Sequence, residues 1–128
     1  MLPKPERLRK SNEFSAVYNK RRSVANSLLI LYTGRLKASP EIPTKVAFVV
    51  GKKVHKNSTE RNLIKRRMRE AYRQIRKSSE ISINQWEFLI FIARPKIFEV
   101  SYKEVYYSIV DCLKRANKKY GNPELAKN

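Results

Sequence analysis

Three apolar runs alternate with polar stretches along the chain and predict β-strands. They span 28–33, 45–51 and 86–94, and each is rich in the β-branched and aromatic residues that strands favour. Residues 34–43 contain two prolines and are typical of a loop. We therefore expect the first two runs to pair as antiparallel strands, and we expect a very short strand at 23–26.

Three other segments carry the apolar period of amphipathic helices. The first begins near Ser11, a favourable N-cap, and its apolar side consists of Phe14, Val17 and Tyr18. The second extends from about Ser58 to Lys77. The third extends from Tyr102 to about Lys119, with Ser101 as its cap and an apolar stripe of Val105, Ile109, Cys112, Leu113 and Ala116.

The predicted order of elements is α-β-β-β-α-β-α. A strand, a helix of about 20 residues and another strand have the spacing of a βαβ unit. A chain of 128 residues is typical of one domain. We expect a single domain over 1–128, with an ordered core at about 7–119 and flexible ends at 1–6 and 120–128.

The helix at 58–77 has two different sides. At about 100° per residue, one stripe is apolar and suited to packing on a sheet; it consists of Ile64, Met68, Ala71, Tyr72 and Ile75. The flank beside that stripe is basic and polar; it consists of Arg61, Asn62, Lys65, Arg66, Arg69, Arg73 and Arg76. Asn57 and Glu60 have the spacing of a capping box at the start of this helix.

Charge concentrates in the same region. Residues 52–77 contain eleven Lys or Arg and two Glu, which is half of the chain's net charge of +18. A solvated helix face is the usual role of such residues, but it normally mixes signs. A polyanionic partner explains the one-sided charge better, with nucleic acid as the leading candidate and an anionic membrane surface as the weaker one. No run approaches the roughly 18 apolar residues of a membrane span.

The single cysteine and the polar first residues favour a cytoplasmic location. Cys112 is the only cysteine, so an internal disulfide is impossible, which fits a reducing compartment. The first residues contain no apolar segment of a secretory signal.

The basic segment resembles the signature of the protein subunit of bacterial ribonuclease P. The matching residues are Lys52-Lys53, Asn57 and Arg61-Asn62-x-Ile64-Lys65-Arg66-x-x-Arg69-Glu70. The resemblance covers roughly residues 7–117, including Arg7-Leu8 and Ile92-Ala93-Arg94-Pro95. Leu63 departs from the family, which usually has Arg there. Because Leu63 lies outside both the apolar stripe and the basic flank, we expect the exchange to remove one peripheral cation.

The resemblance implies an α+β fold, an α/β sandwich in which helices cover a mostly antiparallel sheet of about four strands. It also implies a left-handed βαβ crossover, although about 98% of such crossovers are right-handed. The family binds its catalytic RNA and, with it, precursor tRNA, from which the 5′ leader is removed. Its metal-dependent chemistry belongs to the RNA, so Mg²⁺ is expected mainly on the RNA subunit and the substrate.

No catalytic or metal-binding residue is expected in the protein, and the protein alone is expected to be inactive. Its eleven acidic residues are scattered and His55 is its only histidine. Two-metal hydrolysis would need clustered carboxylates. His55 is interpreted as a bystander or a phosphate donor.

Two sets of site residues follow from the resemblance. The expected RNA-binding residues are Lys52, Lys53, Lys56, Asn57, Arg61, Asn62, Lys65, Arg66, Arg69 and Arg73. The expected leader cleft contains Phe14, Tyr18 and Tyr32, because aromatic faces stack on unpaired bases without demanding a sequence. Core packing is the alternative role for these rings. The pattern leaves open whether Ala47 and Val49, or Phe48 and Val50, face the first helix.

Two other functions remain as alternatives. A structural RNA-binding protein of the ribosomal type would share the size and charge. A DNA-binding regulator is disfavoured because a strand, not a positioning helix, precedes the basic helix. We expect ribonuclease P RNA and precursor tRNA as partners, and neither DNA nor a membrane.

Overall fold

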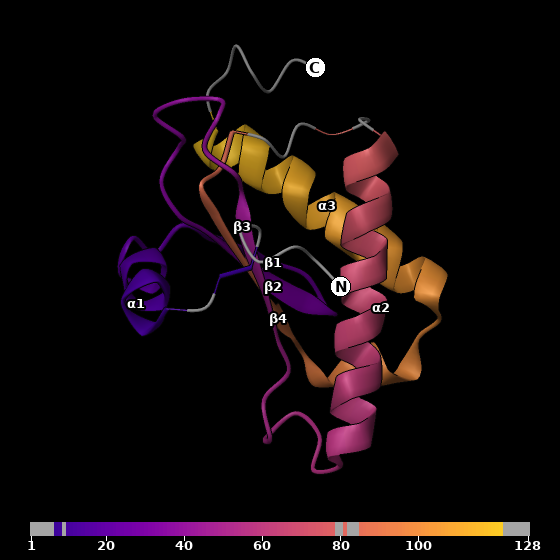
Figure 1. The fold of residues 1–128 in the computed structure, drawn as a ribbon. Coiled ribbons are helices and arrows are strands. Elements are labelled where there is room, and N and C mark those ends of the chain that lie inside the picture. Colours follow the sequence, from indigo (N-terminus) through magenta and orange to yellow (C-terminus); the bar gives the residue numbers. More distant parts are fainter. Residues whose placement is uncertain (1–6, 9, 79–80, 82–84, 122–128) are drawn as a thin grey trace.

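The computed structural model describes residues 7–8, 10–78, 81 and 85–121 of the chain. Figure 1 shows a sheet with α1 on one face and α2 and α3 on the other. The elements in chain order are α1 (Ser11–Asn19), β1 (Ser23–Ala25), β2 (Leu29–Thr33), β3 (Lys45–Val49), α2 (Ser58–Ser78), β4 (Phe88–Ala93), the 3-10 helix η2 (Pro95–Glu99) and α3 (Tyr102–Tyr120). The predicted α+β class and the predicted order of helices and strands are confirmed.

The sheet has the strand order β1-β2-β4-β3. β2 pairs with β1 and β4 in antiparallel register, whereas β3 pairs with β4 in parallel. The apolar runs at 28–33 and 45–51 became β2 and β3. The prediction that they pair with each other is wrong, because β4 lies between them. β4 is apolar at all six positions and mostly buried on both faces, which suits a central strand. The left hand of the β3-α2-β4 crossover stays a prediction.

The two faces of the sheet carry separate apolar clusters. On the α1 side, Val17 packs with Ala47, Phe88 and Ile90. The larger cluster, on the other side, contains the inward residues of α2 and α3. Alternation along β3 places Ala47 and Val49 toward α1, and Val46 and Phe48 toward the helix pair. The sequence left open which residues of this strand face the first helix, and the structure shows that they are Ala47 and Val49.

Both long helices bury the stripes predicted for them. The buried residues of α2 are the predicted five. α3 buries its predicted five and also Ser108 and Asn117. The Asn117 side-chain oxygen accepts hydrogen bonds from Trp86 Nε1 at 2.9 Å and from Gln85 Nε2 at 3.0 Å. These bonds explain how α3 tolerates a buried amide.

The helix ends differ in part from expectation. Lys10, not Ser11, occupies the N-cap of α1, and it makes no side-chain capping bond, so the predicted cap is wrong. Ser101 caps α3 as predicted, because its side chain accepts from the backbone N–H of Glu104 at 3.4 Å. Tyr120, expected in a flexible end, is the last residue of α3, and its hydroxyl donates to the Ser23 carbonyl. The other end segments, 1–6 and 122–128, lie outside the described residues.

Candidate nucleic-acid interface

The start of α2 is fixed by the loop before it. The Asn57 side-chain oxygen accepts from the Thr59 N–H at 2.8 Å, which caps the helix. The Asn57 N–H donates to His55 Nδ1 at 3.1 Å instead of to Glu60, so only the Asn57 half of the predicted capping box is present. Lys52, Lys53 and Lys56 are exposed on this loop.

Arg61 holds the loop against the helix. Its Nη1 donates to the carbonyls of His55 and Lys56, both at 2.8 Å. The His55 ring packs on Phe98 of η2, with the ring centroids 4.6 Å apart. The loop that carries three exposed lysines is therefore held from α2 on one side and from η2 on the other. The sequence predicted that Arg61 contacts RNA but gave no sign of these carbonyl acceptors.

The remaining predicted RNA-binding residues line one flank of α2; they are Asn62, Lys65, Arg66, Arg69 and Arg73. Asn62 and Arg66 are exposed, and Lys65, Arg69 and Arg73 are partly exposed. Arg73 forms an ion pair with Glu70 at 3.2 Å. Among the described residues, no hydrogen bond or ion pair occupies the side chains of Lys65, Arg66 or Arg69. We call this flank, together with the loop lysines, the basic surface; it consists of Lys52, Lys53, Lys56, Arg61, Asn62, Lys65, Arg66, Arg69 and Arg73.

Leu63 lies at the margin of the basic surface. It is exposed at 37%, one of the more exposed large apolar side chains among the described residues. Its position agrees with the expectation that the exchange leaves the buried stripe intact.

The structure brings Phe14, Tyr18 and Tyr32 together on the α1 side of the sheet. The Tyr18 ring lies 6.3 Å from Phe14 and 5.0 Å from Tyr32, the latter edge to face. All three rings pack on the smaller apolar cluster while remaining partly exposed. Burial raises the pKa of Tyr18, and Tyr32 adds to that rise. These three residues, the aromatic group, thus both pack and present ring surface to solvent.

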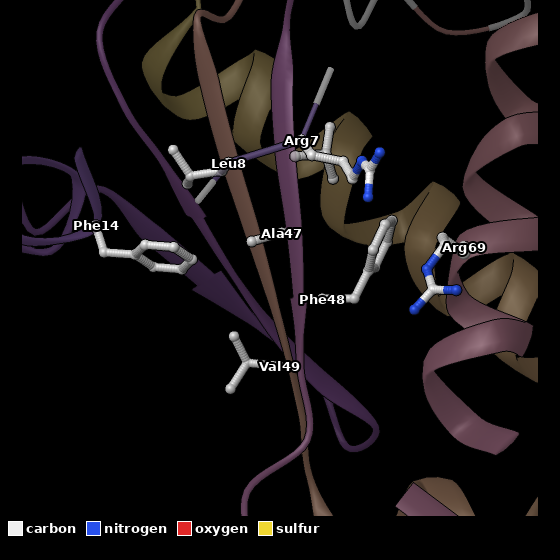
Figure 2. A pocket seen from close by; sticks show the side chains of 8 residues that line it. Arg7, Leu8, Phe14, Ala47, Phe48, Val49 and Arg69 are labelled. Atoms are coloured by element: carbon white, nitrogen blue, oxygen red, sulfur yellow. The ribbon is translucent and has the colours of Figure 1, made fainter. Parts of the chain in front are cut away.

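A pocket of about 210 Å³ joins the two surfaces around β3. β3 is an edge strand, so the pocket can extend from one face of the sheet to the other. Figure 2 shows Phe14 on the α1 side, and Arg7 and Arg69 on the side of Phe48 and α2. Sequence reasoning did not assign Arg7 or Phe48 to a site. The available signal was the Arg7-Leu8 pair within the family resemblance.

The described residues contain no group of three or more His, Cys, Asp or Glu side chains that could hold a metal ion. In the same part of the chain, no helix is both long enough and apolar enough to cross a membrane.

Comparisons with known proteins agree on one family. The family model described as Ribonuclease P matches residues 2–117. The ribonuclease P protein component of Alkaliphilus oremlandii is 39% identical over 111 residues, covering 87% of this chain and 90% of the relative. That of Clostridium novyi is 39% identical over 116 residues, covering 90% and 96%.

Solved structures agree with the sequence comparisons. The RNase P protein of Staphylococcus aureus superposes with a TM-score of 0.72 at 31% identity, covering 93% of this chain and 100% of that one. The RNase P protein of Thermotoga maritima superposes with a TM-score of 0.69 at 24% identity, covering 86% and 96%, which shows a shared fold.

Proposed function

This chain belongs to the ribonuclease P protein family, and we propose on that premise that it is the protein subunit of a bacterial ribonuclease P. In this role it binds the catalytic RNA subunit and the 5′ leader of precursor tRNA. It thereby promotes the endonucleolytic cut that removes the leader. We also propose that it acts in the cytoplasm.

The observation that carries this proposal is the basic surface. The nine side chains of the basic surface include eight cations, and the only ion pair that they form within the described part of the chain is Arg73–Glu70. The flank runs from Arg61 to Arg73 of α2, so it extends about 18 Å at 1.5 Å per residue. A rigid row of cations of that length suits the regularly spaced phosphates of RNA. Arginine guanidinium groups can also bind phosphate in a bidentate manner.

The aromatic group supports the contact with the leader. Phe14, Tyr18 and Tyr32 keep ring surface accessible while the sheet beneath holds them in place. Stacking on such rings contributes about 1–3 kcal/mol per base and tolerates any sequence. That property suits a subunit that must accept the differing leaders of many precursor tRNAs.

We propose that this chain binds and positions RNA and takes no chemical step itself. Phosphodiester hydrolysis would use Mg²⁺ held mainly by the RNA subunit and the substrate. The basic surface neutralises phosphates near the cleavage site, and the aromatic group fixes the path of the leader.

Reconstitution tests the proposal. The purified protein alone should leave precursor tRNA uncut. Added to a bacterial ribonuclease P RNA, it should lower both the Mg²⁺ and the precursor concentrations needed for cleavage. Cleavage by the protein alone, or no effect on the RNA, would show that the proposal is wrong.

A further inference from the structure

One buried cationic donor has no acceptor in the described part of the chain. Arg7 Nε is shielded from solvent and makes no hydrogen bond there. A buried donor without a partner costs about 1–3 kcal/mol, and more when it is charged. Such donors are therefore rare, and this one needs a physical explanation.

The backbone fixes the direction of Arg7. Arg7 forms a parallel bridge with Val46, and the Leu8 N–H donates to the Val46 carbonyl at 3.0 Å. Leu8 is 5% exposed and packs in the cluster on the α1 side. Because neighbouring extended residues point to opposite faces, Arg7 points to the α2 side. It lines the pocket at the edge of β3 there.

Arg69 reaches the same pocket from α2. Figure 2 shows both guanidinium groups directed into the space beside the Phe48 ring. That ring is held in place, since it stacks on Phe91 with centroids 5.6 Å apart and meets Tyr72 edge to face at 5.9 Å. The pocket lining includes two arginines and no carboxylate. Two like charges facing a partly buried space favour an anion between them.

We propose that Arg7 and Arg69 together hold one phosphodiester group of RNA at the edge of β3. The inference rests on the proposed function and adds a site to it. An RNA strand on the basic surface then crosses the edge of β3 at this phosphate and reaches the aromatic group, because Phe14 lines the same pocket. The phosphodiester can come from the RNA subunit or from precursor tRNA.

The experiment compares Arg7→Met, Arg69→Met and the double variant with Lys114→Met. Methionine keeps an apolar stem and removes the charge. Lys114 is exposed on α3 and serves as the charge-matched control. Affinity is measured for the RNA subunit binding the protein, and for the reconstituted enzyme binding precursor tRNA or mature tRNA. Thermal unfolding checks that each variant folds. If Arg7→Met does not fold, Arg69→Met carries the same loss-of-charge test from the α2 side of the pocket. Arg7→Lys, which retains the charge, is measured in either case.

We expect Arg7→Met to weaken at least one of these interactions about tenfold. We also expect the slope of log affinity against log salt to become shallower by about 0.7–0.9, the effect of one lost phosphate. Arg7→Lys should keep that slope and recover part of the affinity. A loss of affinity for the RNA subunit shows that this RNA supplies the phosphodiester. A loss of affinity for precursor tRNA but not for mature tRNA shows that the leader supplies it. A loss of affinity for both tRNAs shows that the tRNA body supplies it.

The double variant tests whether the two arginines share one phosphate. A shared phosphate predicts a combined loss well below the product of the single losses. Losses that multiply would overturn the inference, as would an Arg7→Met variant that matches Lys114→Met in every arm. Either result, with an active wild-type enzyme, leaves the proposed function intact. A wild-type protein without effect on the RNA would instead contradict that function.

Discussion

Asn26 ties the turn between β1 and β2 to α3. Its side-chain oxygen accepts from the backbone N–H groups of Leu28 and Leu29 and from the Ser108 hydroxyl, each at 3.0 Å. Its amide nitrogen donates to the Ser108 carbonyl at 3.1 Å. One side chain thus satisfies polar groups of a turn and of a helix that lie more than 80 residues apart in sequence.

We therefore expect Asn26→Ala to lower the free energy of unfolding by about 2–4 kcal/mol, because several partly buried groups lose their partners. Urea unfolding measures the change. Asn62→Ala, an exposed amide on α2, is the control and should change stability by less than about 0.5 kcal/mol. A loss below about 1 kcal/mol for Asn26→Ala would show that water replaces these bonds.

Tyr32 is the member of the aromatic group that lies on the sheet. Tyr32→Leu keeps apolar volume but removes the flat ring. We expect the reconstituted enzyme to bind a precursor with a leader about tenfold more weakly, because one base loses its stacking partner. Binding of mature tRNA should not change. The control is Tyr107→Leu, since Tyr107 is 58% exposed on α3. Equal losses for both RNAs would favour a packing role for Tyr32.

Cys112 makes the free energy of unfolding depend on pH in the alkaline range. Burial raises the pKa of its thiol to about 12, and Asp111 adds to the rise. The unfolded thiol ionises near its ordinary value of 9.0, so the stabilisation is complete below that pH and is lost between 9.0 and about 12. Between those values, the unfolding free energy of Cys112→Ala should fall less steeply than that of the wild type, by up to about 1.4 kcal/mol per pH unit. Urea unfolding at several alkaline pH values tests this, and equal slopes would contradict it.

At the scale of elements, the loop before α2 depends on Arg61. We expect Arg61→Met to speed amide hydrogen exchange at residues 55–57, because both carbonyl contacts are lost. RNA affinity should also fall through the loosened loop, so Arg61→Met and Lys56→Met should be non-additive.

Arg66→Met is the matched control for Arg61→Met. Arg66 lies on the same helix and is exposed. In the described part of the chain, no hydrogen bond or ion pair joins its side chain to the loop. Arg66→Met should make the slope of log RNA affinity against log salt shallower, without changing amide hydrogen exchange at residues 55–57. Unchanged exchange in Arg61→Met would mean that Arg61 acts only as a direct RNA contact.

The sequence predicted features that short segments encode. The stripe of α2 and the basic flank beside it follow from a period that 20 residues reveal by themselves. The pairing of β2 with β4 did not follow, because β4 lies more than 50 residues later in the chain. Arg7 was missed for the same reason, since its direction depends on a bridge to Val46. The carbonyl acceptors of Arg61 are backbone groups, which residue identity does not reveal.

At the scale of the whole molecule, salt should act in opposite directions on folding and on RNA binding. The chain has a net charge of +18, so its folded state is destabilised by self-repulsion. Some acids are used in ion pairs away from the basic surface, as Glu13 is with Lys45 and Glu87 with Arg35. The cations of the basic surface are thus left largely uncompensated in the described part of the chain.

We therefore expect potassium chloride to raise the unfolding free energy of the free protein, because it screens like charges. The same salt should weaken RNA binding by about 10³–10⁵-fold between about 50 and 200 mM if six to ten phosphates are contacted. Urea unfolding and equilibrium binding across one salt series measure both trends. A non-ionic osmolyte should stabilise the fold without the loss of RNA affinity. If salt instead destabilised the free protein, the expectation that repulsion among its cations destabilises the folded state would be wrong.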